Sequence, residues 1–259
     1  MTLQPPANRS LCAGALLAIL ASCPLLSQAA GLSISPVVIE VDTARRAVAV
    51  TVTNQGDEAV TFQTDTLVWR QVNGVDKFDP TDELLVVPPI VKIAPHSSQV
   101  FRVTLRQPSP SPIERTYRVV LEDVSESQRA TNTNGGASVG FKFAHNLPVM
   151  IAPAGKINNA ARWAACAPKA AAAAERAPSS PEACIRLLNA GNRRFKVRNL
   201  TVTGDDWKQD FPVKDGANIL AGAEREWRIP LQAGQTGALR SVQVQTARGE
   251  TLQAEAGSF

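Results

Sequence analysis

Apolar and polar residues alternate along several segments of this chain, and a period of two is typical of strands with one buried face. Residues 46–54 read RAVAVTVTN, and residues 116–124 alternate in the same way, with Tyr117 on one face and Arg118 on the other. The chain also has 18 prolines and 16 glycines, which supply turns and disfavour long helices. We therefore predict an all-β protein.

The longest alternation covers residues 138–151, SVGFKFAHNLPVMI. One face of this predicted strand carries seven residues, of which all but the histidine are apolar: Val139, Phe141, Phe143, His145, Leu147, Val149 and Ile151. Such a face at the last strand of a β-sandwich ordinarily packs into the core of its own domain.

Turn signals divide the first half into seven predicted strands. Residues 32–41 contain a proline, which implies an edge strand or a change of sheet. Asn73-Gly74 predicts a hairpin, and residues 86–93 and 99–106 form a strand–turn–strand unit around Pro-His-Ser-Ser. Seven short strands over about 120 residues are typical of an immunoglobulin-like sandwich.

The second half is also predicted to be β. Residues 184–190 and 195–203 flank a predicted hairpin turn, and further strands are expected at 227–231 and 239–246. Pro153-Ala154-Gly155 is typical of a joint between domains. We expect one domain over residues 30–153 and a second over residues 154–259.

Residues 1–29 have the pattern of a secretory signal peptide. Their apolar stretch at 16–27 is too short to span a bilayer, and small residues precede a cleavage position after Ala29. The alternative is a lipoprotein signal, because Leu-Ala-Ser before Cys23 resembles the motif in which that cysteine is lipidated. Either interpretation predicts an exported protein.

The charge distribution argues against nucleic-acid binding. The formal net charge is +4, and the basic excess of the second half is small and scattered. The densest basic cluster, RRFKVR at 193–198, alternates with apolar residues. We interpret it as a strand with one solvated basic face.

The predicted mature chain has two cysteines, Cys166 and Cys184, which we expect to form a disulfide in an oxidising compartment. Two cysteines with the distant His96 and His145 do not make a metal-ligand set, so neither a metal nor a cofactor is expected, and both histidines are interpreted as structural. The sequence has no nucleophile elbow, zinc-protease motif, phosphate-binding loop or dinucleotide turn, so we expect no enzyme and no small-molecule substrate.

Three segments together resemble the periplasmic chaperones that assemble pili through the chaperone–usher pathway. They read PPIVKIAPHSSQVFRV, ERTYRVVLEDV and KFAHNLPVMIAP, and the resemblance covers most of residues 32–155. The Tyr-Arg strand and the Leu-Pro-Val ending are similar to the archaic, spore-coat-U-like branch of this PapD-like family. The resemblance implies two immunoglobulin-like sandwiches in a boomerang arrangement.

The resemblance also implies a mechanism. A pilin subunit is an immunoglobulin fold without its last strand, and the chaperone lends its own last first-domain strand to complete the subunit's sheet. In this chain, that donor strand would present Val139, Phe141, Phe143, Leu147 and Val149 to the subunit. An outer-membrane usher would then replace the donor strand with the next subunit's extension. In a free chaperone, self-association would cover the same strand.

In classical members of the family, an arginine on the first strand and a lysine on the last strand of domain one hold the subunit's carboxyl terminus. The best-matching positions here are Val38 and either Asn146 or Pro148, which are uncharged. A buried carboxylate still requires a cation. We therefore predict Arg118 as the anchor, followed by Lys142, with Lys156 in reserve.

The competing hypothesis is an exported β-sandwich that serves in adhesion or ligand binding, anchored to lipid through Cys23. The start of the mature chain separates the two hypotheses. A chaperone should begin at Ala30, and the lipoprotein should begin at an acylated Cys23.

Overall fold

The structure is a computed structural model in which every regular element is a β-strand over the ranges that it describes. These are residues 31–42, 46–107, 109–125, 142–166, 182–232, 234–235 and 238–259. The predicted signal peptide, Cys23, Val139 and Phe141 lie outside the described residues. No helix within these ranges is long and apolar enough to cross a membrane.

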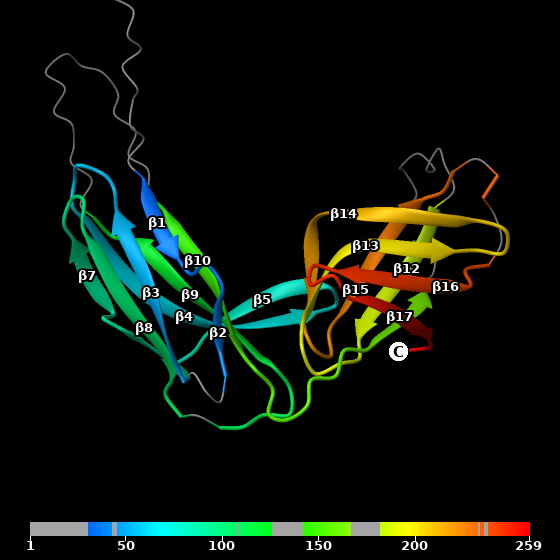
Figure 1. The fold of residues 1–259 in the computed structure, drawn as a ribbon, viewed down its shortest axis with the longest axis horizontal. Coiled ribbons are helices and arrows are strands. Elements are labelled where there is room, and N and C mark those ends of the chain that lie inside the picture. The colour runs from blue at the N-terminus through cyan, green and yellow to red at the C-terminus, as the bar shows by residue number, and fades with distance from the viewer. Residues whose placement is uncertain are drawn as a thin grey trace, which may run out of the picture.

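The first domain is a sandwich of two sheets, shown in blue to green in Figure 1. One sheet has the order β1-β3-β8-β6. Its strands are β1 (Leu32–Ser35), β3 (Ala47–Asn54), β8 (Ser98–Leu105) and β6 (Leu84–Val87). The other sheet has the order β2-β10-β9-β4-β5, with β7 also paired to β4. Its strands are β2 (Ile39–Val41), β10 (Ala144–Ile151), β9 (Arg115–Asp123), β4 (Val60–Val72), β5 (Val75–Pro80) and β7 (Ile90–Ile93).

The predicted alternation builds the core between these two sheets. Tyr117, Val119 and Leu121 are buried on the inner face of β9, and Arg118 lies on the outer face. Phe62 from β4 and Phe101 from β8 pack against them in the same apolar cluster. The period-two pattern therefore assigns the faces of these strands correctly.

The chain changes sheet at two prolines. The Ser35–Pro36 peptide bond is cis, and it lies between β1 in one sheet and β2 in the other. Both alternatives predicted for residues 32–41, an edge strand and a change of sheet, therefore occur. The prediction of one strand over 86–93 is wrong. The cis peptide bond at Val87–Pro88 separates β6 from β7, which belong to opposite sheets.

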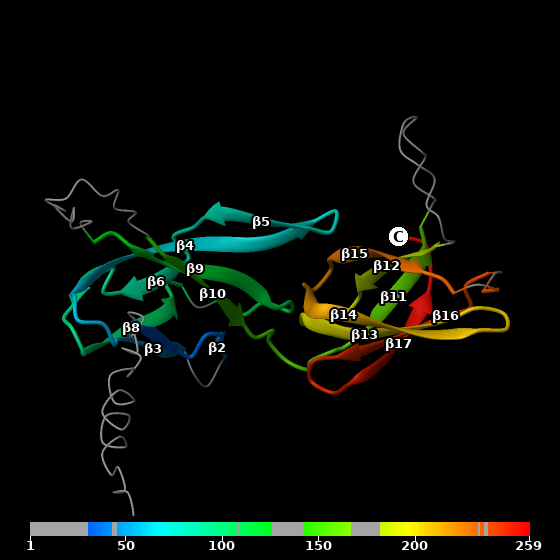
Figure 2. The same cartoon turned by 90° about the horizontal axis from the view of Figure 1, so that it is seen from above.

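The Asn73-Gly74 hairpin is present between β4 and β5. Both turn residues have positive φ, 51° at Asn73 and 74° at Gly74, which is the backbone conformation that these two residue types tolerate. The hairpin extends beyond the rest of its sheet toward the second domain, as Figure 2 shows. It is therefore placed to contact both domains.

The second domain contains seven strands in the order β14-β13-β16-β17-β11-β12-β15. These are β11 (Ala161–Ala165), β12 (Glu182–Asn189), β13 (Phe195–Thr203), β14 (Lys208–Ile219), β15 (Glu224–Pro230), β16 (Ser241–Thr246) and β17 (Thr251–Ala256). Strand β17 pairs antiparallel with β16 and parallel with β11, so it joins two halves that enclose a second apolar core.

The predicted hairpin between the strands at 184–190 and 195–203 is wrong. Both strands exist, but β12 pairs with β11 and β15, whereas β13 pairs with β14 and β16. The turn therefore connects the two halves of the sandwich. The prediction failed because the Asn-Ala-Gly-Asn signal indicates only that the chain reverses and does not indicate which strands pair.

The two sandwiches meet at an angle, which gives the boomerang arrangement expected from the resemblance (Figure 1). Gln71 near the tip of β4 connects them directly. Its Nε2 donates to the Asn218 carbonyl at 3.0 Å, and its Oε1 accepts from the Leu220 N–H at 2.9 Å. Trp69 and Met150 of the first domain also pack into the apolar cluster of the second.

Candidate functional site

Strand β10 has a free edge over part of its length. It pairs with β9 from Ala144 to Ile151 on one side. On its other side, β2 runs parallel to it and covers only Val149–Ile151. Among the described residues, no strand pairs with this side of Ala144–Pro148.

The hydrogen-bond pattern shows which backbone groups this edge presents. The Asp123 N–H donates to the Phe143 carbonyl at 2.9 Å, so odd-numbered residues of β10 bond toward β9. Even-numbered residues point the other way, as Ala152 does when its N–H donates to Val41 at 2.8 Å. The free edge therefore presents the N–H and carbonyl groups of Ala144 and Asn146, while the parallel pairing of Val149 with Ile39 uses the carbonyl of Pro148.

Two of the residues predicted to contact a subunit are buried in the core instead. Leu147 and Val149 are only 6% and 0% exposed, and both pack in the core of the first domain. They stabilise their own domain and are not available as surface plugs for a subunit. Phe143 shares their face but precedes the strand, and it is 58% exposed.

Arg118 lies on the outer face of β9, directly opposite Pro148 of β10. It lines a pocket of about 420 Å³ together with Pro148 and Met150. The rest of the wall comes from both domains: Val38, Glu40, Arg194, Phe195, Lys196, Asn218, Ala247, Arg248 and Glu250. The pocket thus begins where the free edge of β10 ends.

Two aromatic rings hold the Arg118 guanidinium. Its central carbon lies 4.0 Å from the centroid of the Trp69 ring and 5.6 Å from that of Phe78. Burial lowers the pKa of Arg118 below its usual value, and the negative charge of Asp76 opposes this shift. An arginine remains charged under such conditions. Its Nε is buried and has no hydrogen-bond partner among the described residues.

The second domain adds three cations to the pocket wall, Arg194, Lys196 and Arg248. Arg194 is ion-paired to Glu114 at 2.6 Å and to Glu40 at 2.9 Å, and the Arg248 guanidinium lies 3.4 Å from Glu40. Glu114 and Glu40 belong to the first domain, so these ion pairs cross the interface. The Glu114 side chain is 2% exposed and that of Arg194 is 10% exposed.

The pKa of Glu40 reflects this environment. Burial alone would raise the pKa of the carboxyl group, but the hydrogen bond from Arg194 and the charges of Arg194, Arg193 and Arg248 lower it below its usual value. Glu40 therefore stays ionised and neutralises part of the positive charge around the pocket. Arg118, which lies on β9 of the same sheet, has no ion pair among the described residues.

The structure does not bring the other predicted anchors to this pocket. Lys142 precedes β10 and lies six residues before Pro148, roughly 20 Å away along an extended chain. It is exposed, and at this distance it cannot bind a carboxylate in the pocket of Arg118. Lys156 is also exposed, and it does not line the pocket.

Sequence reasoning missed the role of the basic cluster at 193–198. Lys196 is exposed on β13, as predicted for a solvated face. Arg193 and Arg194 precede the strand and turn back toward Glu40 and Glu114 instead. The available signal was their position in the turn between two predicted strands, where alternation no longer assigns a face.

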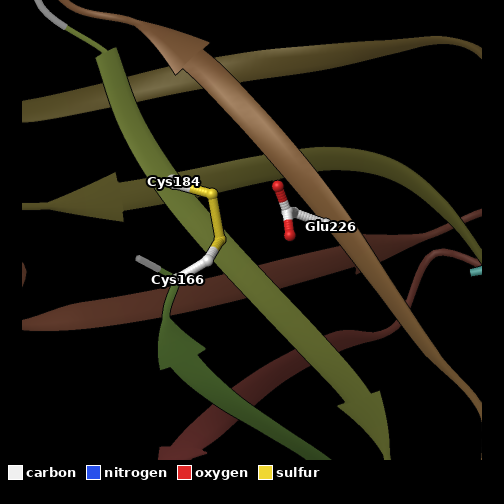
Figure 3. A group of neighbouring side chains, drawn as sticks. All are labelled: Cys166, Cys184 and Glu226. Atoms are coloured by element: carbon white, nitrogen blue, oxygen red, sulfur yellow. A yellow bond between two sulfur atoms is a disulfide. The ribbon is translucent and has the colours of Figure 1, made fainter. Parts of the chain in front are cut away.

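The predicted disulfide is present, because Cys166 and Cys184 are bonded at 2.07 Å. Figure 3 shows the Glu226 carboxylate beside it. These three residues are close enough together to suggest a metal site. However, sulfurs that are bonded to each other cannot act as thiolate ligands. Glu226 is instead ion-paired with Arg228 at 2.9 Å.

Comparison with known proteins identifies the first domain. Residues 31–156 match the family model of the PapD N-terminal domain, described as the pili and flagellar-assembly chaperone domain. The first domain of this chain belongs to that family. No curated protein sequence matches the chain significantly.

Solved structures show that the fold of both domains is similar to that of known chaperones. One is from the CsuC–CsuE chaperone–tip adhesion subunit complex of the archaic Csu pili of Acinetobacter baumannii, with 15% identity, a TM-score of 0.63, and coverage of 88% of this chain and 100% of that chain. The class 5 fimbriae chaperone CfaA has 14% identity, a TM-score of 0.62 and the same coverage.

A third similar structure is the Salmonella enterica SafA pilin in complex with the SafB chaperone. It has 14% identity and a TM-score of 0.56, and it covers 88% of this chain and 98% of that chain. Similarity at this level of identity establishes the two-domain fold. It assigns no role to individual residues.

Proposed function

We propose that this chain is a periplasmic, non-enzymatic chaperone that caps pilin subunits by donor-strand complementation and delivers them to an outer-membrane usher. The family of the first domain and the fold shared with chaperones solved in complex with pilus subunits support this proposal. The predicted signal peptide is consistent with export to the periplasm.

One juxtaposition carries the proposal: the free edge of Ala144–Pro148 ends at the cationic pocket of Arg118. A subunit strand that runs parallel to β10 would continue the line of β2 and stop near Val38. Its terminal carboxylate would then lie beside Arg118. A charge-assisted hydrogen bond between these groups is stronger than a neutral one.

The energetics of such an edge favour tight binding without ATP. Each main-chain hydrogen bond contributes about 1 kcal/mol net, and the free edge offers two donors and two acceptors, at Ala144 and Asn146. Burying an exposed apolar side chain such as Phe143 adds about 1.5–3 kcal/mol. Val139 and Phe141 remain proposed contacts from the part of the chain that precedes Phe143. In a free chaperone the same edge could pair with a second copy.

The proposal is tested by a proline at the free edge. The Asn146 N–H points away from β9, and Pro148 occupies an equivalent position, so Asn146→Pro leaves the β9 ladder intact. It removes one donor and places ring atoms where the subunit backbone would lie. The matched control, Asn146→Ala, keeps the N–H.

Both variants are co-expressed in a bacterial periplasm with a pilin subunit from the same genome, and the captured subunit is quantified. We expect Asn146→Ala to capture the subunit as the unmodified chain does. Asn146→Pro should lose about tenfold in capture, equivalent to about 1.4 kcal/mol. Equal capture by two equally folded variants would refute the donor-edge assignment.

A further inference from the structure

The environment of Arg118 indicates how its charged group is oriented. We infer that Trp69 is a positioning residue, which fixes the plane of the Arg118 guanidinium so that it selects a ligand with a terminal carboxylate. This inference rests on the proposed function. It adds that ring stacking, in addition to positive charge, creates the carboxylate preference.

Strand register places the participating side chains on one face. Arg118 of β9 lies opposite Leu67 of β4, and Trp69 is the next residue on the same side of β4. Trp69 lies opposite Phe78 of β5 in the strand register, and the centroids of the two stacked rings are 6.4 Å apart. The guanidinium therefore lies against a surface built by two adjacent strands.

Hydrogen bonds hold the larger ring in place. The Trp69 indole N–H donates to Asp76 Oδ1 at 3.1 Å, and Gln71 Nε2 donates to the same oxygen at 2.8 Å. Trp69 is also buried against the apolar cluster of the second domain. Its ring is therefore restrained on several sides.

The same bonds connect the ring to the second domain. Gln71 contacts the backbone of Asn218 and Leu220, and Asn218 also lines the pocket. A chain of contacts thus runs from β14 through Gln71, Asp76 and Trp69 to Arg118. The orientation of the guanidinium is consequently linked to the docking of the two domains.

Stacking has a specific consequence for arginine. The guanidinium is planar, and its donors lie along its edge, so a group held flat against a ring directs its N–H bonds sideways. A carboxylate can accept two parallel bonds from such an edge, whereas a terminal amide offers one acceptor. An aliphatic side chain in place of Trp69 would leave Arg118 its charge but release its rotamers.

The probe is an acetylated peptide of one lysine followed by alternating valine and threonine, prepared with a free carboxylate or with a terminal amide. Its affinity for the full chain is measured by calorimetry, and the ratio of the two affinities is the readout. For the unmodified chain we expect the free acid to bind about tenfold more tightly. Trp69→Leu should lower this ratio about fivefold, whereas Trp69→Phe, which keeps a ring face, should restore most of it.

Trp227→Leu is the matched control, because it makes the same change on β15 of the second domain and should keep the ratio. Phe78 is exposed, so Phe78→Leu carries little risk to folding and should lower the ratio about twofold. If Trp69→Leu does not fold, the affinity ratio of Phe78→Leu tests the inference in its place.

The outcomes distinguish the carboxylate anchor of the proposed function from the positioning role of the rings. If the unmodified chain does not prefer the free acid, the proposed carboxylate anchor fails. If the preference exists and survives both Trp69→Leu and Phe78→Leu, the positioning role of the rings is wrong. Equal losses in Trp69→Leu and Trp69→Phe would assign the effect to packing volume and overturn the ring-stacking inference.

Discussion

Tyr117 is the only tyrosine of the chain and one of its most deeply buried side chains. Its hydroxyl group donates a 2.5 Å hydrogen bond to Glu83. Burial raises the pKa of Tyr117 to about 12, and the bond to Glu83 acts in the same direction, while the charge of Arg115 opposes it. Because the phenol ionises more readily in the unfolded chain, near pH 10, Tyr117 stabilises the fold fully below that pH.

This stabilisation should be lost as the pH rises from about 10 to about 12. With one tyrosine, the ultraviolet absorbance of tyrosinate reports this ionisation directly. We expect the folded protein to show a midpoint near 12 and the urea-unfolded protein a midpoint near 10. A midpoint near 10 in protein that circular dichroism shows to be folded would contradict the buried environment of Tyr117.

At the same scale, the sequence predicted residues on strands better than residues in turns. Alternation placed Arg118 opposite Tyr117 on β9, and the structure confirms this. It could not locate Arg193 and Arg194, because a turn has no fixed period and long side chains follow the nearest opposite charge. Lys142 was predicted as an anchor without the knowledge of which end of β10 faces the second domain.

At the scale of the elements, prolines predicted only some of the points at which the chain changes sheet. A proline in residues 32–41 predicted an edge strand or a change of sheet, and the chain does change sheet between β1 and β2. The pair Pro88-Pro89 was placed inside one predicted strand, although the chain changes sheet there as well. Most strands of the first domain were predicted within a few residues. The pairing of β12 and β13 was not, since partners in a sandwich are set by packing of the whole domain.

Strand β10 shows the same limit. Its alternating face was predicted, but Leu147 and Val149 belong to the core, as the simpler interpretation of that face had it. The feature that matters for the proposed function is the unpaired edge of Ala144–Pro148. An edge depends on where β2 ends, and no periodicity along β10 itself encodes it.

At the scale of the whole molecule, buried charges join the two domains. Glu114 accepts two bonds from Arg194, one from the guanidinium at 2.6 Å and one from the backbone N–H at 2.9 Å. Its own N–H donates to the Asn192 carbonyl at 2.8 Å. Breaking a buried pair by removing one partner costs about 3 kcal/mol or more.

Glu114→Ala should therefore loosen the interface, and small-angle X-ray scattering should show a larger radius of gyration and a broader distance distribution. Glu226→Ala serves as the control, because it removes an exposed ion pair within the second domain. A scattering curve of Glu114→Ala that superimposes on that of the unmodified chain would show that other contacts, such as those of Gln71, are sufficient to fix the angle.

The central claim is that a subunit pairs with the free edge of β10. Hydrogen exchange measured by nuclear magnetic resonance at single amides tests it most directly, because the Ala144 and Asn146 N–H groups point away from β9. Both amides should become strongly protected when a pilin subunit binds, while the amides of His145 and Leu147, already bonded to β9, change little. Unchanged exchange at Ala144 and Asn146 in a saturated complex would contradict the account.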